Sequence, residues 1–269
     1  MDQSTFGRKF DPRINHAPAG FDLKSDLPAG FAEFFVELHK QFTPRQQELV
    51  RKRFEVLQDA HAGRLPDYRE TPEEVRADWR IELPAWCRDQ RNQMTGPADD
   101  AELVVKMLNS GAPGVMIDLE DSMANCWENL ERGIQNALAA LHGSLVYYDR
   151  KRGREVSIAE SDTVLWTRVR GLHLNQAGLF ADELASASVY DVARIAFGVE
   201  RSKLKHDLAF YIPKTESAEE GLFWRDLFAA VEEKLGWEKG FIKCMALVEA
   251  HPFAYQLEEF IYNLRGHIL

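Results

Sequence analysis

One short stretch constrains the fold of this chain more than any other. Residues 115–122, of sequence VMIDLEDS, form an apolar run that ends in three carboxylates. The run is too short for a helix and follows glycine and proline at positions 111–114, so it predicts a buried strand. Buried parallel strands carry such runs, and ligands gather just past their C-terminal ends. Alternation along a strand predicts that Asp118 and Glu120 point the same way.

The end of this stretch has two interpretations. Asp121 or Ser122 can cap a following helix, as acids and serines do at helix N-termini. Alternatively, Asp118 and Glu120 place two negative charges close together, which requires a cation, a proton or water nearby.

The composition predicts a soluble globular protein with one large domain or two small ones. Of its 269 residues, 45% are hydrophobic and 28% are charged. No apolar run approaches the roughly 20 residues that span a membrane, and residues 1–11 lack the apolar core of a signal peptide. Three widely spaced cysteines predict reduced thiols, hence a cytoplasmic protein. A formal charge of −10 without a basic stripe argues against nucleic-acid binding.

The N-terminal quarter is predicted to be helical after an irregular start over residues 1–30. Apolar residues recur at three- and four-residue intervals over 31–42, which predicts one helix. Thr43-Pro44 reads as a capping box that starts a second helix to about residue 62, and Thr71-Pro72 starts a short third one. This segment carries no obvious chemistry, so we expect it to serve as packing or as a clasp.

Beyond Thr95-Gly96-Pro97 strands and helices alternate, which predicts βαβ units and a parallel sheet. The expected strands are 114–119, 144–148, 163–169, 208–213 and 241–248. The expected helices are 99–109, 127–141, parts of 180–205, 217–235 and one from about 252, with a hairpin near 144–158. A complete (β/α)₈ barrel takes about 250 residues, and only four or five strands follow the first 110. The pattern alone therefore favours an open doubly wound sheet over part of a barrel.

Arginines mark the second polar strand end. Arg168 and Arg170 lie two apart and are expected on one face. A guanidinium there can bind a carboxylate or stabilise negative charge that develops in a reaction. The alternative is a pair of surface arginines that hold the carboxylates of the first strand.

Two further strand ends carry single charges. Lys214 can be a Schiff-base nucleophile, but a salt bridge is the simpler prediction. Glu249 can start a helix, or it can join Asp118 and Glu120 in a site for Mg²⁺, which prefers one or two carboxylates. His173 and His251 are alternative ligands, but no second histidine lies at close spacing to either of them. No nucleotide-binding, serine-hydrolase or zinc-protease motif is present.

Taken in chain order, these stretches resemble the malate synthase family in its shorter, A-type isoform. The resemblance extends from about residue 20 onward, and Leu119 departs from it where the family often has an aromatic residue. It is carried by Phe42-Thr43-Pro44-Arg45, Leu65-Pro66-Asp67, Asp78-Trp79-Arg80-Ile81, Asp89-Gln90-Arg91, Thr95-Gly96-Pro97, the 115–122 stretch with Trp127 after it, 168–174, 211–215, 240–243 and Leu247-Val248-Glu249.

The resemblance implies an α/β fold: a partial (β/α)₈ TIM barrel over residues 93–269, preceded by an N-terminal helical clasp over residues 1–92. It implies an acyltransferase of the glyoxylate bypass that condenses acetyl-CoA with glyoxylate and water to malate and CoA. Arg168 matches the family's catalytic arginine, which stabilises the enolate of acetyl-CoA. Glu249 matches a ligand of Mg²⁺, which polarises glyoxylate. Asp118 and Glu120 match acidic residues that line the site behind the ligands.

The family continues beyond Leu269 with a second metal ligand, further barrel strands and a C-terminal domain that holds the catalytic aspartate. We therefore expect a truncated or split enzyme, inactive alone, that self-associates or needs a complementary C-terminal half. The alternatives are a non-catalytic half-barrel interaction module and an enzyme like citrate lyase β or malyl-CoA lyase, whose strand ends are similar. The segment through Thr95-Gly96-Pro97 and residues 168–174 favour malate synthase.

Overall fold

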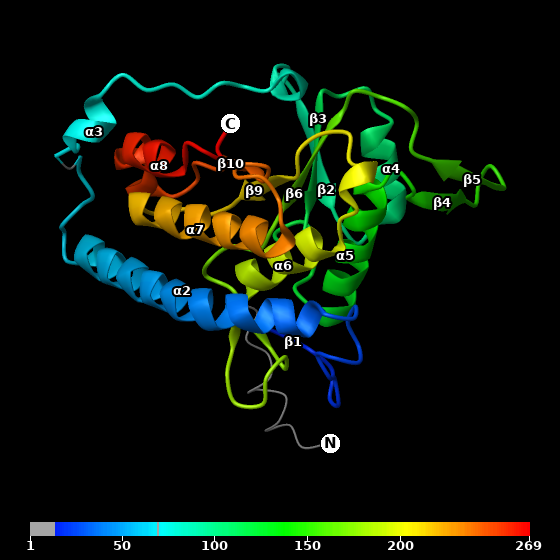
Figure 1. Cartoon of the computed structure of the whole chain (residues 1–269), viewed down its shortest axis with the longest axis horizontal. Helices are drawn as coiled ribbons and strands as arrows, with labels where there is room; N and C mark the ends of the chain where they lie inside the picture. Colours follow the sequence, from blue (N-terminus) through cyan, green and yellow to red (C-terminus); the bar gives the residue numbers. More distant parts are fainter. Residues whose placement is uncertain (1–13, 69) are drawn as a thin grey trace.

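A five-stranded parallel sheet organises the structure, a computed structural model that describes residues 14–68 and 70–269 (Figure 1). The prediction about residues 1–11 therefore lies outside the described residues. Every neighbouring pair in the sheet is parallel. From one edge to the other, its strands are β2 (Gln93–Pro97), β3 (Gly114–Asp118), β6 (Val164–Arg168), β9 (Ala209–Ile212) and β10 (Lys243–Ala246).

The order of these strands separates a barrel from an open doubly wound sheet. Each new strand joins the edge formed by the one before it, so sheet order equals chain order. A doubly wound sheet reverses direction part-way, whereas a barrel proceeds one way round. The preference for an open sheet is therefore wrong, and the partial TIM barrel is confirmed. Among the described residues β2 and β10 do not pair with each other, so the barrel is not closed.

Helices follow the strands, as the alternating pattern predicts. They are α4 (Ala101–Leu108), α5 (Trp127–Leu141), α6 (Ala187–Gly198), α7 (Ala218–Leu235) and α8 (Leu257–Leu264), after β2, β3, β6, β9 and β10 respectively. Successive strand residues point to opposite faces. Val115, Ile117 and Phe210 thus pack with the helices in the main core. Met116, Trp166 and Tyr211 form a second cluster on the inner face of the partial barrel.

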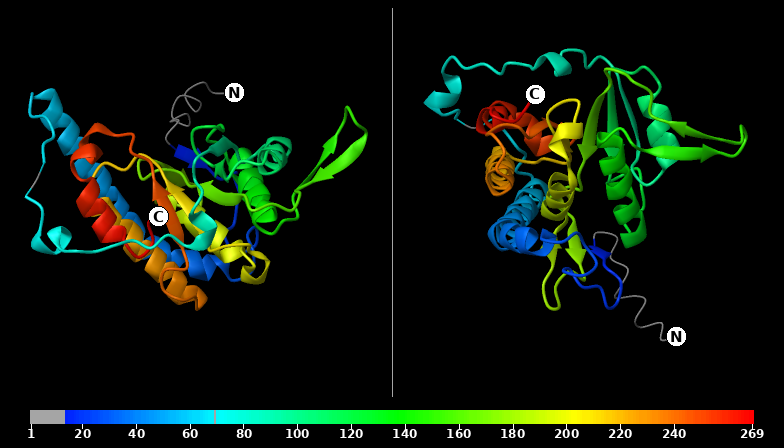
Figure 2. Two further views of the ribbon diagram at one scale, coloured as in Figure 1. Left: turned by 90° about the horizontal axis from the view of Figure 1, so that it is seen from above. Right: turned by 45° about the vertical axis from the view of Figure 1, so that its right-hand side comes forward.

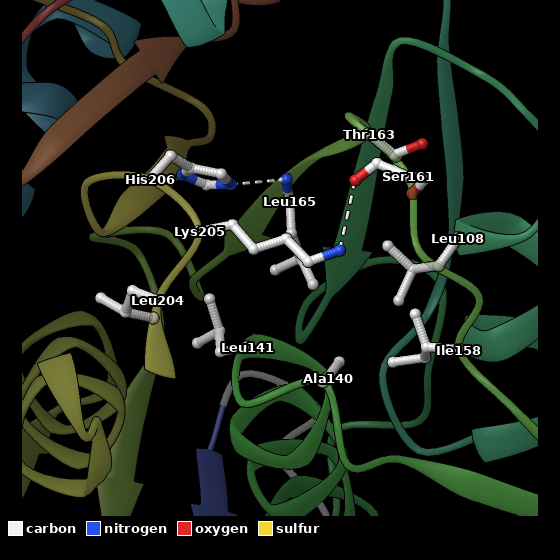
Figure 3. A pocket seen from close by; sticks show the side chains of 11 residues that line it. Leu108, Ala140, Leu141, Ile158, Ser161, Thr163, Leu165, Leu204, Lys205 and His206 are labelled. Carbon is white, nitrogen blue, oxygen red and sulfur yellow. Dashed lines mark hydrogen bonds between the residues drawn. The ribbon is translucent and has the colours of Figure 1, made fainter. Parts of the chain in front are cut away.

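A histidine side chain completes the connection between β6 and β9. The backbone N–H of Leu165 donates to His206 Nε2 over 3.1 Å (Figure 3). His206 Nδ1 lies 2.7 Å from the carbonyl oxygen of Asp207. The strand pairing itself involves only Thr167 and Arg168 of β6. Burial lowers the pKa of His206, which suits a neutral ring that accepts at one nitrogen and donates at the other.

Two cavities lie beside this histidine. The one drawn in Figure 3 has a volume of about 30 Å³, room for only a few waters, whereas the other is an open cavity of about 760 Å³ that His206 lines together with Trp86. The smaller cavity lies near the N-terminal end of β6, next to Thr163 and Leu165. The candidate residues of the sequence follow the opposite ends of the strands.

The N-terminal segment forms one long helix, α2 (Phe31–His61), with Pro44 inside it. The prediction of two helices divided at Thr43 is wrong. Proline removes one backbone hydrogen bond, but buried Phe42 and Leu49 on either side of it keep the helix on the core. Thr43 does not cap a helix, because its hydroxyl accepts from Ser186 N over 3.1 Å and contacts His39. In Figure 1, α2 lies alongside α6 and α7.

The remaining elements confirm some predictions and correct others. The third helix, α3 (Glu73–Arg76), and the hairpin of β4 (Val146–Asp149) and β5 (Arg154–Ser157) are present, and the hairpin projects from the body in Figure 2. A small sheet that the sequence did not predict contains β1 (Ile14–His16), β7 (Asn175–Ala177) and β8 (Ala185–Ser186), so residues 1–30 are not irregular throughout. Two short 3₁₀ turns, η1 (Ala85–Cys87) and η2 (Arg201–Lys203), lie in connections, and a third, η3 (His251–Tyr255), precedes α8.

The first strand of the sheet, β2, was also missed, since the sequence placed the first buried strand at 114–119. β2 begins at Gln93, and the division of the chain after residue 92 stays a prediction. No helix within residues 14–68 and 70–269 is both long and apolar enough to cross a membrane.

The packing of α2 on the partial barrel predicts that substitution of two of its phenylalanines affects the free energy of unfolding very differently. Phe35 is fully buried against Phe31, Phe180 and Tyr190. Phe35→Ala should therefore lower the free energy of unfolding by about 3–5 kcal/mol. Phe54→Ala, on the same helix but 57% exposed, should change it by less than about 1 kcal/mol. Urea unfolding measures both, and equal effects would show that α2 does not pack on the partial barrel as described.

Candidate active site

The polar ends of β3 and β6 lie side by side at the C-terminal edge of the sheet. Strand register pairs Asp118 with Arg168, and Arg168 with Tyr211. Asp118 and Arg168 follow Met116 and Trp166 by two residues, so their side chains continue the inner face of the partial barrel.

Arg168 and Asp118 form a buried two-point ion pair. Arg168 Nε lies 2.7 Å from Asp118 Oδ1, and Nη2 lies 2.6 Å from Oδ2. Asp118 is fully buried and Arg168 is 7% exposed. Asp118 also accepts from the backbone N–H groups of Glu120 and Ser122, each over 2.8 Å, and from the Ser122 hydroxyl.

This arrangement fixes the charge of both groups. Burial alone would raise the pKa of Asp118, but the hydrogen bonds from Arg168 and Ser122 outweigh it and lower that pKa. Its oxygens are fully used, so Asp118 can neither ligate a metal nor accept a further proton without breaking a bond. Its role is to hold Arg168 in place.

Lys214 joins the next two carboxylates. Its Nζ lies 2.8 Å from Glu120 Oε2 and 2.6 Å from Asp121 Oδ2. The other oxygen of Glu120 accepts from Gly171 N over 3.1 Å. Burial raises the pKa of Glu120, and the neighbouring charge of Lys214 only partly opposes this.

Lys214 is a salt-bridge partner, as predicted, and is not poised as a nucleophile. Burial would lower the pKa of its amine, but the hydrogen bonds to Asp121 and Glu120 outweigh this and raise it. The amine is therefore protonated at neutral pH, and a protonated amine cannot attack a carbonyl. Lys214 also has a backbone φ of 49°, the only positive value at a non-glycine residue in the described part of the chain.

Glu249 connects to this group through the backbone of Lys214. Its Oε1 accepts from Lys214 N over 2.8 Å. Glu249 lies beyond the end of β10 and is exposed, and it does not start a helix, because the following turn begins after Ala250. The structure thus joins Asp118 and Arg168 in an ion pair and places the Glu120 carboxylate 3.9 Å from Arg168. Glu249 is linked to this group through the backbone N–H of Lys214.

Arg170 departs from its prediction. β6 ends at Arg168, so strand alternation no longer applies two residues later. Arg170 is fully buried and pairs with Asp191 of α6, with Nη2 2.8 Å from Oδ1, and not with the carboxylates that follow β3. It is a core ion pair and not a surface arginine.

The structure also shows where the two histidines proposed as alternative ligands and the two residues proposed as helix caps lie. His173 Nε2 lies 3.8 Å from Glu120 Oε1, whereas His251 is exposed beside Tyr255. Neither Asp121 nor Ser122 caps a helix, because α5 starts after Cys126.

Arg53 of α2 is the residue that sequence reasoning missed. Its Nη2 lies 2.8 Å from the carbonyl of Lys214. It follows Phe42, Gln46 and Leu49 at helical spacing on the buried face of the helix, which is the signal that could have identified it.

Comparison with known proteins assigns the family. The model described as malate synthase, N-terminal domain, matches residues 25–73, and the model described as malate synthase, TIM barrel domain, matches residues 164–269. Together they match more than half of the chain. The chain belongs to the malate synthase family.

Curated malate synthases resemble the chain along nearly all of its length. Malate synthase A of Escherichia coli (strain K12) is 33% identical over 94% of this chain, and malate synthase of Streptomyces clavuligerus is 35% identical over 95%. Malate synthase of Oryza sativa subsp. japonica is 33% identical over 93%. These matches cover 48%, 49% and 47% of the relatives, so the chain spans about half the length of the malate synthases it matches.

The buried ion pair predicts unequal effects of two neighbouring substitutions. Asp118→Asn leaves the Arg168 charge buried without its partner and should lower the free energy of unfolding by about 3–5 kcal/mol. Asp121→Asn removes an exposed partner of Lys214 and should cost less than about 1 kcal/mol. Urea unfolding of both variants measures the difference, and an equal small loss would contradict the assigned role of Asp118.

His173 predicts a loss of stability on acidification. Burial, with the charges of Lys214 and Arg53, lowers its pKa from 6.5 to about 4. Between pH 6.5 and 4 the unfolded chain binds a proton that the folded chain does not, so stability falls as pH falls through this window. His173→Asn should flatten this part of a stability profile measured by urea unfolding from pH 7 to 4.5. An unchanged slope would show that His173 titrates normally.

Proposed function

We propose that this chain contributes Arg168 and Glu249 to a malate synthase active site. The reaction at that site condenses acetyl-CoA with glyoxylate and water to malate and CoA. The observation that carries the proposal is the buried Arg168, held by Asp118 at the end of β6 in a member of this family. It lies at the C-terminal end of barrel strands, where active sites of this fold lie.

Arg168 is proposed to stabilise the enolate of acetyl-CoA. Its Nε and Nη2 are occupied by Asp118, and its Nη1 is 3.9 Å from Glu120, beyond hydrogen-bond distance. Within residues 14–68 and 70–269, Nη1 therefore has N–H groups left to donate. A fixed donor aimed at a developing oxyanion stabilises the transition state without reorganisation.

Glu249 is proposed as one ligand of Mg²⁺. One of its oxygens accepts from Lys214 N, and the other is left for a cation, whereas Asp118 and Glu120 are engaged in ion pairs. The described residues hold no group of three or more histidine, cysteine, aspartate or glutamate side chains that could bind a metal. One carboxylate still fits Mg²⁺, which takes most of its ligands from water and substrate oxygens. When bound, the ion would polarise the aldehyde of glyoxylate.

Asp118 and Glu120 are proposed to support these two residues and not to react. Asp118 orients Arg168, and Glu120 with Asp121 holds the ammonium group of Lys214. Lys214 in turn orients Glu249 through its backbone.

The catalytic assignment predicts large losses in activity. In a protein that combines this chain with the remaining part of a relative's barrel, Arg168→Lys and Glu249→Gln should each lower the rate of CoA release by about 10²–10³. Arg51→Gln, on the exposed face of α2, is the control and should keep the rate. CoA release is followed with a thiol reagent. We expect no release from residues 1–269 alone, and activity that survives both site substitutions would refute the assignment.

We further propose that the partial barrel associates, either with a complementary segment or with a second copy. β2 pairs only with β3 among the described residues, and Met94 on it and Val248 after β10 are 39% and 56% exposed. An open strand edge beside apolar side chains favours association.

A cytoplasmic location is proposed from the three free cysteines, and cell fractionation tests it.

Sedimentation should detect this association. Residues 1–269 should form oligomers at micromolar concentration in analytical ultracentrifugation, because the edge is open. Met94→Lys with Val248→Lys should shift the distribution toward monomer, since lysine protects an edge. Val146→Lys, at a similarly exposed valine on the projecting hairpin, is the control. A wild-type monomer would refute association with a second copy.

A further inference from the structure

Helix α2 contacts the candidate site through one arginine. Arg53 of α2 is 10% exposed at its side chain and forms a two-point pair with the buried Glu220 of α7: its Nε lies 2.7 Å from Oε1 and its Nη2 2.7 Å from Oε2. The same Nη2 lies 2.8 Å from the carbonyl oxygen of Lys214. One guanidinium thus joins α2, α7 and the loop after β9.

Both backbone groups of Lys214 are engaged in this chain of contacts. Its carbonyl accepts from Arg53, and its N–H donates to Glu249 Oε1 over 2.8 Å. Lys214 adopts the left-handed conformation, with φ 49°. An L-residue is unfavourable in that conformation, so it persists only where the surroundings hold it.

We propose that Arg53 is a positioning residue that holds Lys214 in its left-handed conformation and thereby aims Glu249 toward the cation. This inference rests on the proposed role of Glu249 as a ligand. It assigns the clasp helix a part in the site, although α2 contributes no group that reacts.

The competing explanation is that Arg53 only neutralises the buried carboxylate of Glu220. Arg53→Gln would then act by leaving Glu220 unpaired, and it could also prevent folding. The double variant Arg53→Gln/Glu220→Gln removes both charges of this pair together, so it leaves neither buried charge without its partner, while it still deletes the bond from the Arg53 guanidinium to the Lys214 carbonyl. Arg51→Gln is the matched control, because Arg51 pairs with no described residue other than the exposed Glu48 and Glu55 on its own helix.

Two measurements on the full chain test the proposal. Hydrogen exchange followed by mass spectrometry reports protection of the Lys214 amide, which donates to Glu249. Electron paramagnetic resonance of added Mn²⁺, used as a probe for Mg²⁺, reports affinity for the cation. In the double variant we expect faster exchange at Lys214 and Mn²⁺ binding weakened about tenfold, as for loss of other contacts that orient a ligand. Arg51→Gln should change neither.

The outcomes separate this inference from the proposed function. Wild-type exchange and Mn²⁺ affinity in the double variant would overturn the inference, because Arg53 would then serve Glu220 alone. Faster exchange with unchanged Mn²⁺ affinity would also overturn it, because Lys214 would not aim Glu249. If Glu249→Gln binds Mn²⁺ as tightly as the wild type does, the ligand role of Glu249 fails. The exchange data would then still decide whether Arg53 holds Lys214.

Discussion

A guanidinium buried at the end of a strand must have an anionic partner, and the register of two strands supplies it here. β3 and β6 pair so that Asp118 lies opposite Arg168, with both side chains on the inner face. A slip of one residue would turn Asp118 to the outer face, among the apolar side chains of the helices. It would also leave the charge of Arg168 unpaired, which is strongly unfavourable. The packing of the sheet and the geometry of the candidate site are therefore one constraint.

The pairing of charges then distinguishes residues that look alike in the sequence. Asp118 forms an ion pair with Arg168, and Glu120 forms one with Lys214. Among the described residues, Glu249 accepts only from the backbone N–H of Lys214, which leaves its other oxygen for the proposed cation. In the same part of the chain, Arg168 keeps N–H groups on Nη1 without a hydrogen bond. Arg168 and Glu249, which have hydrogen-bonding positions left, are the residues to which the family resemblance assigns roles in the reaction. Asp118 and Glu120, which are engaged in ion pairs, are the residues that it places next to them.

The sequence predicted the features that depend on local pattern. The strand ending at Asp118, the arginine at the end of β6 and the helices between strands follow from period and turn residues. Features that depend on distant contacts were missed. β2 carries Thr95-Gly96-Pro97, which resembles a turn until its pairing with β3 is known. Pro44 looks like a helix start until the packing of α2 is known. Arg170 resembles its neighbour two residues earlier until Asp191 is placed.

The buried face of α2 shows why a helix without reactive groups can still belong to a site. Its apolar stripe is interrupted by polar residues, and three of them bond the backbone of a loop or short strand that follows a main strand. Gln46 donates to the carbonyl of Leu172, Thr43 accepts from Ser186 N, and Arg53 donates to the carbonyl of Lys214. Backbone groups outside regular structure need partners when buried. By supplying these partners, α2 orders the segments after β6 and β9, and those segments carry or contact the candidate residues.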